Sequence, residues 1–156
     1  FKEATKLAEG GDKIAQYNLG LMYMSGTGVP QDDKEAGKWF KMSAEQGEAR
    51  GQSILGAMYV TGRGVPQDDQ VAARWYRMSA EQGYADAQLN LGVMYANGRG
   101  VPQDYKEAHA WLSVAKGNGN ELAEKYLGIV TKKMTKEQIA DAQSLSIEIQ
   151  KRIRGK

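Results

Sequence analysis

Residues 12–47 read DKIAQYNLGLMYMSGTGVPQDDKEAGKWFKMSAEQG, and this pattern returns twice, each time 36 residues further along the chain. Leu19, Gly20 and Trp39 show the register most clearly. Their copies are Leu55, Gly56 and Trp75 in the second unit, and Leu91, Gly92 and Trp111 in the third. A fixed period of this length is typical of a stacked repeat, in which each unit covers an apolar face of its neighbour. The sequence therefore predicts a repeat solenoid.

Each unit reads as a pair of helices. From residue 12 to about residue 25, apolar residues recur at spacings of three and four, which is the helical period and not the alternation of a strand. Gly26 and Pro30 then end the helix and form a turn. A second helix follows Asp32 and runs to about Gln46. The expected fold class is therefore all-α.

Two local features describe how these helices begin and pack. Asp32 is the expected N-cap of the second helix, with Glu35 completing a capping box, and Asp104 with Glu107 repeats this arrangement. At Asp68 only the cap is expected. Glycine in the middle of the first helix, as at Gly20, costs about 1 kcal/mol relative to alanine. We interpret it as room for the close approach of a neighbouring helix, with the tryptophan as the candidate contact.

The chain is expected to form one repeat domain over residues 1–156. Residues 1–11 align with the second helix of an incomplete unit, and full repeats follow at 12–47, 48–83 and 84–119. Residues 120–133 keep only a first helix. A capping helix is expected at 135–154, where Thr135 and Gln138 form a capping box before an apolar stripe with a polar reverse face. Because the chain begins at Phe1, a leader or an upstream segment is expected to have been removed.

Composition narrows the classes of function. The formal charge of +2 comes from 21 basic and 19 acidic residues that are mixed along the chain, which disfavours nucleic-acid binding. There is no cysteine, and so no disulfide or cysteine metal site. No apolar run approaches the roughly 18 residues of a membrane span, so membrane insertion is not expected.

The partner-binding surface is predicted from the contrast between the two sides of the first helices. The side that carries Leu19 and Gly20 has nearly the same residues in each unit, whereas the residues on the opposite side vary. This contrast is expected when the repeated side serves stacking and the variable side forms a groove for one partner. The candidate partner-binding residues are Tyr17, Asn18, Leu21, Arg50, Ile54, Asp86, Asn90, Val93, Lys125 and Tyr126. The alternative is that the aliphatic members simply pack against the first helices of adjacent units.

Catalytic and metal sites are not expected. His109 is the only histidine, and we interpret it as a solvated or partly packed helix residue. Asp32, Asp68 and Asp104 are interpreted as helix caps, because equivalent residues on stacked units lie about 10 Å apart and cannot share one ion. No nucleophile lies beside a base in a recognisable pattern, and no cofactor is expected.

The repeated unit resembles the Sel1-like repeat, a relative of the tetratricopeptide repeat. The residues that carry the resemblance in the first unit are Ala15, Leu19, Gly20, Tyr23, Gly26, Gly28, Val29, Asp32, Ala36, Trp39, Ala44 and Gly47. The resemblance implies a right-handed α/α superhelix that serves as a protein-interaction scaffold and whose first helices line the concave surface. It also implies a bacterial protein that is periplasmic or secreted, with the cytoplasm as the alternative.

Three functions follow from these observations. The first is a non-enzymatic scaffold or adaptor that binds a peptide or partner protein in the concave groove. The alternative is a cell-envelope hydrolase or a peptidoglycan-binding module. A third hypothesis is weak self-association through the N-terminal end, where the incomplete unit leaves an apolar face uncovered.

Overall fold

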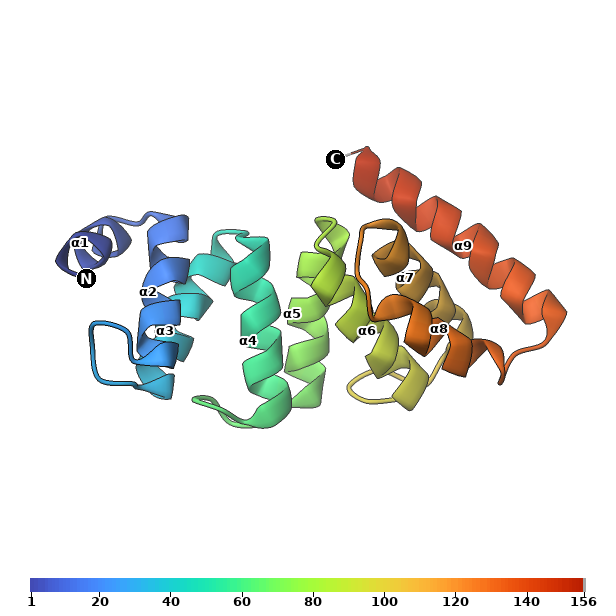
Figure 1. The fold of residues 1–156 in the computed structure, drawn as a ribbon, viewed down its shortest axis with the longest axis horizontal. Coiled ribbons are helices and arrows are strands. Elements are labelled where there is room, and N and C mark those ends of the chain that lie inside the picture. Colours follow the sequence, from blue (N-terminus) through green and yellow to red (C-terminus); the bar gives the residue numbers. More distant parts are fainter. Residues whose placement is uncertain (156) are drawn as a thin grey trace. The chain divides into compact units, whose positions relative to one another are not determined.

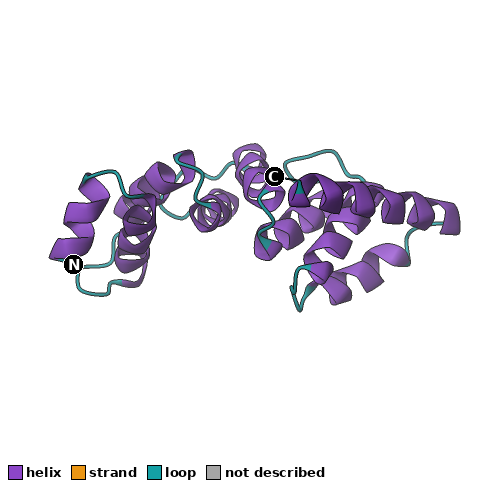
Figure 2. Cartoon of the chain, turned by 90° about the horizontal axis from the view of Figure 1, so that it is seen from above, coloured by secondary structure: helices purple, strands orange, loops and turns teal. Residues whose placement is uncertain are grey.

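The computed structural model describes residues 1–155, and every regular element in this part of the chain is a helix (Figures 1 and 2). The helices are α1 Lys2–Glu9, α2 Lys13–Ser25, α3 Asp33–Glu45, α4 Ala49–Thr61, α5 Asp69–Glu81, α6 Ala85–Asn97, α7 Tyr105–Gly117, α8 Ala123–Thr131 and α9 Lys136–Arg154. The expected all-α fold class is confirmed. The chain divides into two compact units: an N-terminal unit, Phe1–Trp75, and a C-terminal unit that starts at Tyr76.

The helix ends follow the expected chemistry with one difference. Asp32 accepts a bond from the Glu35 N–H at 3.1 Å, and Asp68 accepts one from the Val71 N–H at 3.1 Å. The reciprocal half of the predicted capping box is missing both at Asp32 and at Asp104, where only the aspartate cap forms. The Glu35 carboxylate lies 3.9 Å from the Lys38 ammonium instead. A complete capping box begins α9, where Thr135 and Gln138 exchange two bonds of 2.9 and 3.1 Å.

The glycine within the first helix admits a neighbouring side chain, but not the one we expected. A Cβ on Gly20 would lie 2.6 Å from the ring of Phe40, and one on Gly92 would lie 2.9 Å from Leu112. The contact is therefore the residue that follows the tryptophan. Trp39 is buried by other neighbours, in a cluster of the N-terminal unit that includes Leu19. An alanine at Gly20 or Gly92 would clash with the helix that packs there.

A buried glutamine joins each first helix to the second helix before it. The side-chain amides of Gln16, Gln52 and Gln88 donate to the carbonyl oxygens of Ala8, Ala44 and Ala80, at 3.1, 3.1 and 3.0 Å. All three glutamines are almost fully buried. Each of these carbonyls lies in the last turn of the preceding helix and also accepts a bond from a backbone N–H, that of Gly11, Gly47 or Gly83, so the glutamine is its second donor.

Two of these glutamines also accept a hydrogen bond from a side chain at the end of the second helix of their own repeat. Gln16 accepts a bond from the Gln46 amide at 2.7 Å, and Gln88 accepts one from the Asn118 amide at 2.9 Å. Each of these side chains therefore ties three successive helices together. The equivalent position in the partial repeat holds Glu124, which is exposed and lies 3.4 Å from the Lys116 ammonium.

The C-terminal unit ends differently from a repeat, because α9 packs against α7 and not in a pair with α8. Residues Ala110 and Val114 of α7 are buried, whereas the equivalent Lys38 and Met42 of α3 are exposed. A bidentate ion pair joins the last turn of α9 to α5, with Arg152 nitrogens 2.7 and 3.0 Å from the Glu81 carboxylate. The outer face of α7 is thus adapted to receive the capping helix.

We predict that Gln88→Leu lowers the free energy of unfolding by about 1–3 kcal/mol, because two hydrogen bonds of Gln88 are lost, to the Ala80 carbonyl and from the Asn118 amide, each worth about 0.5–1.5 kcal/mol. Glu124→Leu is the matched control at the exposed equivalent position, with an expected change within about 0.5 kcal/mol. Urea unfolding followed by circular dichroism measures both. Equal effects of the two substitutions would contradict the proposed role of the buried amide.

Candidate functional site

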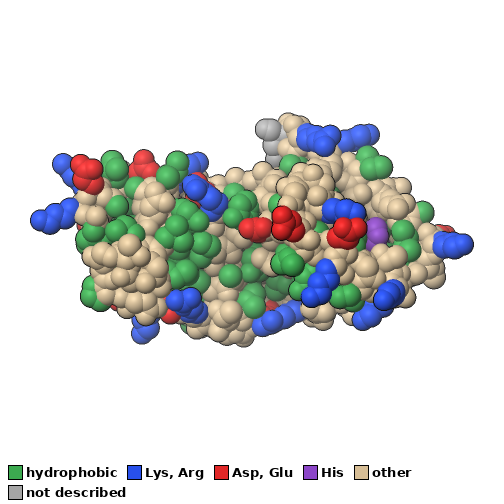
Figure 3. All heavy atoms as spheres, in the orientation of Figure 1, with side chains coloured by type: hydrophobic (Ala, Val, Ile, Leu, Met, Phe, Trp, Pro, Cys, Tyr) green, Lys and Arg blue, Asp and Glu red, His purple; other side chains and the backbone are tan. Residues whose placement is uncertain are grey.

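In the N-terminal unit, four candidate residues lie on α2 and α4 and form one surface, which we call face 1: Tyr17, Leu21, Arg50 and Ile54. Its three uncharged side chains are half-buried and pack against a buried cluster that contains Phe40 and Met58. The Tyr17 and Phe40 ring centroids are 5.9 Å apart. Figure 3 shows hydrophobic side chains gathered on the visible surface over α2 and α4. These residues therefore combine packing with exposed apolar surface.

Arg50 is held in a fixed orientation across face 1. Its guanidinium carbon lies 4.5 Å from the centroid of the Tyr17 ring, in a cation–π arrangement. Its Nε donates to the Glu48 carboxylate at 2.8 Å, and this bond is the main reason why the pKa of Glu48 is lowered. Because both groups are partly exposed, the pair contributes to orientation more than to stability. Face 1 thus presents a positive group above an aromatic ring.

In the C-terminal unit, the candidate residues on α6 and α8 form face 2: Asp86, Asn90, Val93, Lys125 and Tyr126. Asp86 is exposed, and its carboxylate accepts a bond of 3.0 Å from the Asn120 amide. Asn120 in turn accepts a bond from the Leu122 N–H at 2.9 Å, just before α8. Asp86 therefore helps to position α8. Lys125, like Asn18 of the N-terminal unit, is exposed.

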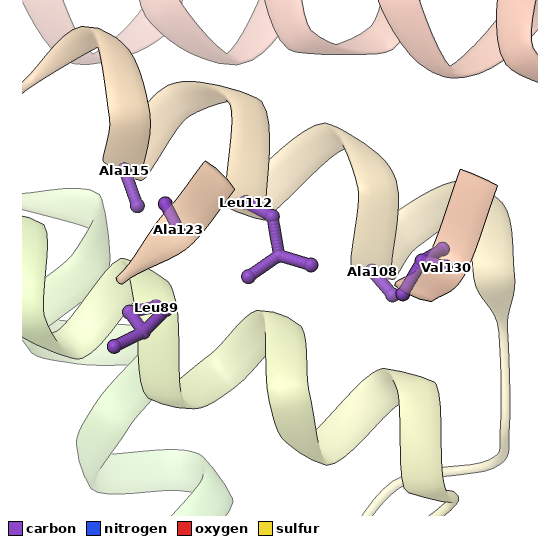
Figure 4. Packing of buried hydrophobic residues seen from close by; sticks show 6 residues of the cluster. All are labelled: Leu89, Ala108, Leu112, Ala115, Ala123 and Val130. Carbon is purple, nitrogen blue, oxygen red and sulfur yellow. The ribbon is translucent and has the colours of Figure 1, made fainter. Parts of the chain in front are cut away.

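A cavity of about 150 Å³ opens between α6, α7 and α8. Its apolar wall is formed by Val93, Ala96, Leu112 and Val130, and its polar groups include Tyr105, Tyr126 and Lys133. Figure 4 shows Leu112 of α7 pointing towards α6, with Ala108 and Val130 close together. Val93 and Tyr126 are candidate partner-binding residues from the sequence, whereas the contributions of Tyr105 and Lys133 were not predicted.

His109 is buried, with 6% of its surface exposed, which corrects the interpretation of a solvated or partly packed residue. The equivalent residues Gly37 and Ala73 are buried as well, so the position faces the interior in every repeat. The small residues Gly37 and Ala73 at this position were the feature of the sequence that could have indicated burial of His109. The His109 ring lies 3.4 Å from the Ser113 hydroxyl, and burial lowers the pKa of His109.

Within residues 1–155, no three His, Cys, Asp or Glu side chains come close enough to hold a metal ion. Asp32, Asp68 and Asp104 each accept a backbone bond at the start of a helix, as the interpretation of helix caps requires. None of the helices in the same residues is sufficiently long and apolar to cross a membrane.

Comparisons with known proteins agree with this geometry. The model of the Sel1 repeat family matches residues 13–48, 49–84 and 85–120. The crystal structure of a Sel1 repeat protein from Oxalobacter formigenes is 40% identical, with a TM-score of 0.75, and the match covers 81% of this chain and 96% of that one. Comparison with curated proteins found no match.

Two further solved structures are similar. The protein c5321, a protective antigen of uropathogenic Escherichia coli strains that displays an SLR fold, is 40% identical with a TM-score of 0.90. That match covers 96% of this chain but only 32% of c5321. The cysteine rich protein B of Helicobacter pylori is 24% identical with a TM-score of 0.64, over 81% of this chain and 96% of that one, and it shares the fold.

We predict that the free energy of unfolding decreases as the pH falls below about 6.5, the ordinary pKa of histidine. The folded chain favours neutral His109, whereas the unfolded chain takes up a proton in this range, so acid favours unfolding. His109→Ala, which copies the equivalent Ala73, should reduce this dependence. Urea unfolding at pH 7 and pH 5 measures it, and an unchanged pH dependence in the variant would contradict the assignment.

Proposed function

Because the chain belongs to the Sel1 repeat family, whose members are typically protein-interaction scaffolds, we propose that it is a non-enzymatic adaptor. We propose that it binds a peptide or a partner protein along the first helices of its repeats. The partner-binding residues are those of face 1 and face 2, together with Asn18. No nucleic acid, metal or cofactor is part of this proposal.

The observation that carries the proposal is the contrast between two neighbouring positions of the first helix. Leu19, Leu55 and Leu91 are identical and fully buried. In successive repeats, the preceding position holds Asn18, Ile54, Asn90 and Tyr126, and each of these side chains is exposed or half-buried. Stacking accounts for the identical position. Variation at accessible positions on the other side is what a surface tailored to a partner requires.

The chemistry of the two faces suits a peptide. Face 1 offers half-buried apolar side chains beside the Arg50 guanidinium, which can meet an apolar residue and a neighbouring carboxylate or carbonyl. Face 2 offers the Asn90 amide, three residues before Val93, which lines the apolar cavity. Amide groups next to apolar surface can satisfy the backbone of an extended peptide while its side chains are buried.

We also propose a bacterial protein that is exported to the periplasm or secreted, since this is the location that the family resemblance implies. Two similar solved structures, those from Oxalobacter formigenes and uropathogenic Escherichia coli, are bacterial. Fractionation of the native host with an antibody against this chain tests the location.

Peptides selected from a displayed random library against this protein test the function. We predict that combined Tyr17→Ala, Ile54→Ala and Asn90→Ala substitutions weaken the selected peptides by about tenfold or more, since each truncation removes contact area. The matched control changes Lys38 and Arg74, exposed residues of the second helices, to alanine and should leave affinity unchanged.

Circular dichroism of both variants must retain the helical signal, so that a loss of binding reports on the surface and not on unfolding. If the truncation of Ile54 destabilises the fold, a second variant that changes only Asn18 and Asn90 to alanine provides the test. Unchanged peptide affinity in the folded face variants would contradict the proposal. Turnover of peptidoglycan fragments would favour the alternative function.

A further inference from the structure

The cavity between α6, α7 and α8 is a local departure from the repeat. In the N-terminal unit the equivalent space is filled, because Met58 is 2% exposed and packs with Phe40, Leu21 and Met24. Every one of these positions carries a smaller side chain around the cavity. The equivalent pairs are Leu21 and Val93, Met24 and Ala96, Phe40 and Leu112, and Met58 and Val130. The hollow therefore results from four smaller residues at one place.

The charges at this place also differ between the two units. In the N-terminal unit, Asp33 forms an ion pair with Arg63 at 2.8 Å. Tyr105 stands at the position equivalent to Asp33, and the repeat ends before a counterpart of Arg63 is reached. The cavity instead has Lys133, at a position that is Thr61 in the N-terminal unit. The C-terminal unit therefore lacks this ion pair and has a lysine beside the cavity instead.

Lys133 is available to an anion. Its ammonium lies 5.8 Å from the centroid of the Tyr105 ring, and both residues line the cavity. No carboxylate lines the cavity, and none in residues 1–155 lies within ion-pair distance of Lys133. The cavity thus combines an apolar interior with one positive group at its wall.

We propose that this cavity binds the C-terminal residue of a peptide, with a phenylalanine ring in the apolar interior and the terminal carboxylate at Lys133. An apolar cavity of about 150 Å³ is known to hold a benzene-sized group. The ring and the terminal carboxylate belong to one residue, so both can reach one small cavity. In an extended peptide, by contrast, the next side chain points to the opposite side. This inference rests on the proposed peptide-binding function and gives it a ligand class.

The probe is the peptide acetyl-Gly-Ser-Gly-Ser-Phe with a free C-terminus, titrated into the ¹⁵N-labelled full chain and followed by amide chemical shifts. The largest shift changes are expected at the cavity, around Ala96, Tyr126 and Lys133. The same peptide with a C-terminal amide should bind roughly threefold or more weakly, since it lacks the charge that meets the ammonium. A peptide with an internal Phe-Asp pair and an amidated end should resemble the amide.

Two substitutions separate the ring from the charge. Val130→Met restores the residue of the filled space, Met58, and should weaken the free-acid peptide by about tenfold or more because the ring loses its site. Lys133→Gln should make the acid and amide peptides bind equally, as a thermodynamic cycle requires if this ammonium is the partner of the carboxylate. Lys132→Gln, an exposed neighbour outside the cavity, is the matched charge control and should keep the preference for the acid.

Equal binding of acid and amide to the unaltered chain would overturn the proposal, as would unchanged binding to a folded Val130→Met variant or equal affinity for the internal Phe-Asp peptide. The exposed Lys133→Gln substitution provides the test if Val130→Met disturbs folding. These results are distinct from failure of the general function. Library-selected peptides that bind face 1 while the C-terminal phenylalanine peptide does not would reject the cavity assignment alone.

Discussion

The buried glutamine of each repeat is the interaction on which the stacking depends. Gln16, Gln52 and Gln88 each donate to a carbonyl in the last turn of the preceding second helix. A buried amide is costly without partners and directional with them, so these bonds favour one register of each first helix on the second helix before it. Where the equivalent residue is the exposed Glu124, regular pairing stops and α9 packs on α7 instead.

Because stacking uses only one side of the first helices, the residues on the other side can differ. They differ between the N-terminal and the C-terminal unit. In the N-terminal unit, Phe40 and Met58 fill the space behind face 1, and Asp33 is paired with Arg63. In the C-terminal unit, Leu112 and Val130 leave a cavity at the equivalent place. The same repeat pattern therefore supports both a filled space and a cavity, although α8, at Ala123–Thr131, is shorter than its counterpart α4, at Ala49–Thr61.

Much of the fold could be predicted, because the 36-residue period aligns equivalent residues and the helix signals agree within each copy. The contact at Gly20 was assigned to the wrong neighbour, since spacing alone does not distinguish Trp39 from Phe40 on adjacent faces. The burial of His109 could have been predicted from Gly37 and Ala73 at the equivalent positions, but the cavity beside Val130 depends on which helices follow α7. The period ends there, so the sequence no longer indicated how α8 and α9 would pack.

The central claim is that a partner contacts the variable side of the first helices while the repeated side serves stacking. The most direct measurement is the structure of the chain with a library-selected peptide bound. Our account predicts peptide atoms in contact with face 1 or face 2 and an unchanged hydrogen bond from each buried glutamine. A peptide bound on the outer side of the second helices, away from both faces, would contradict it.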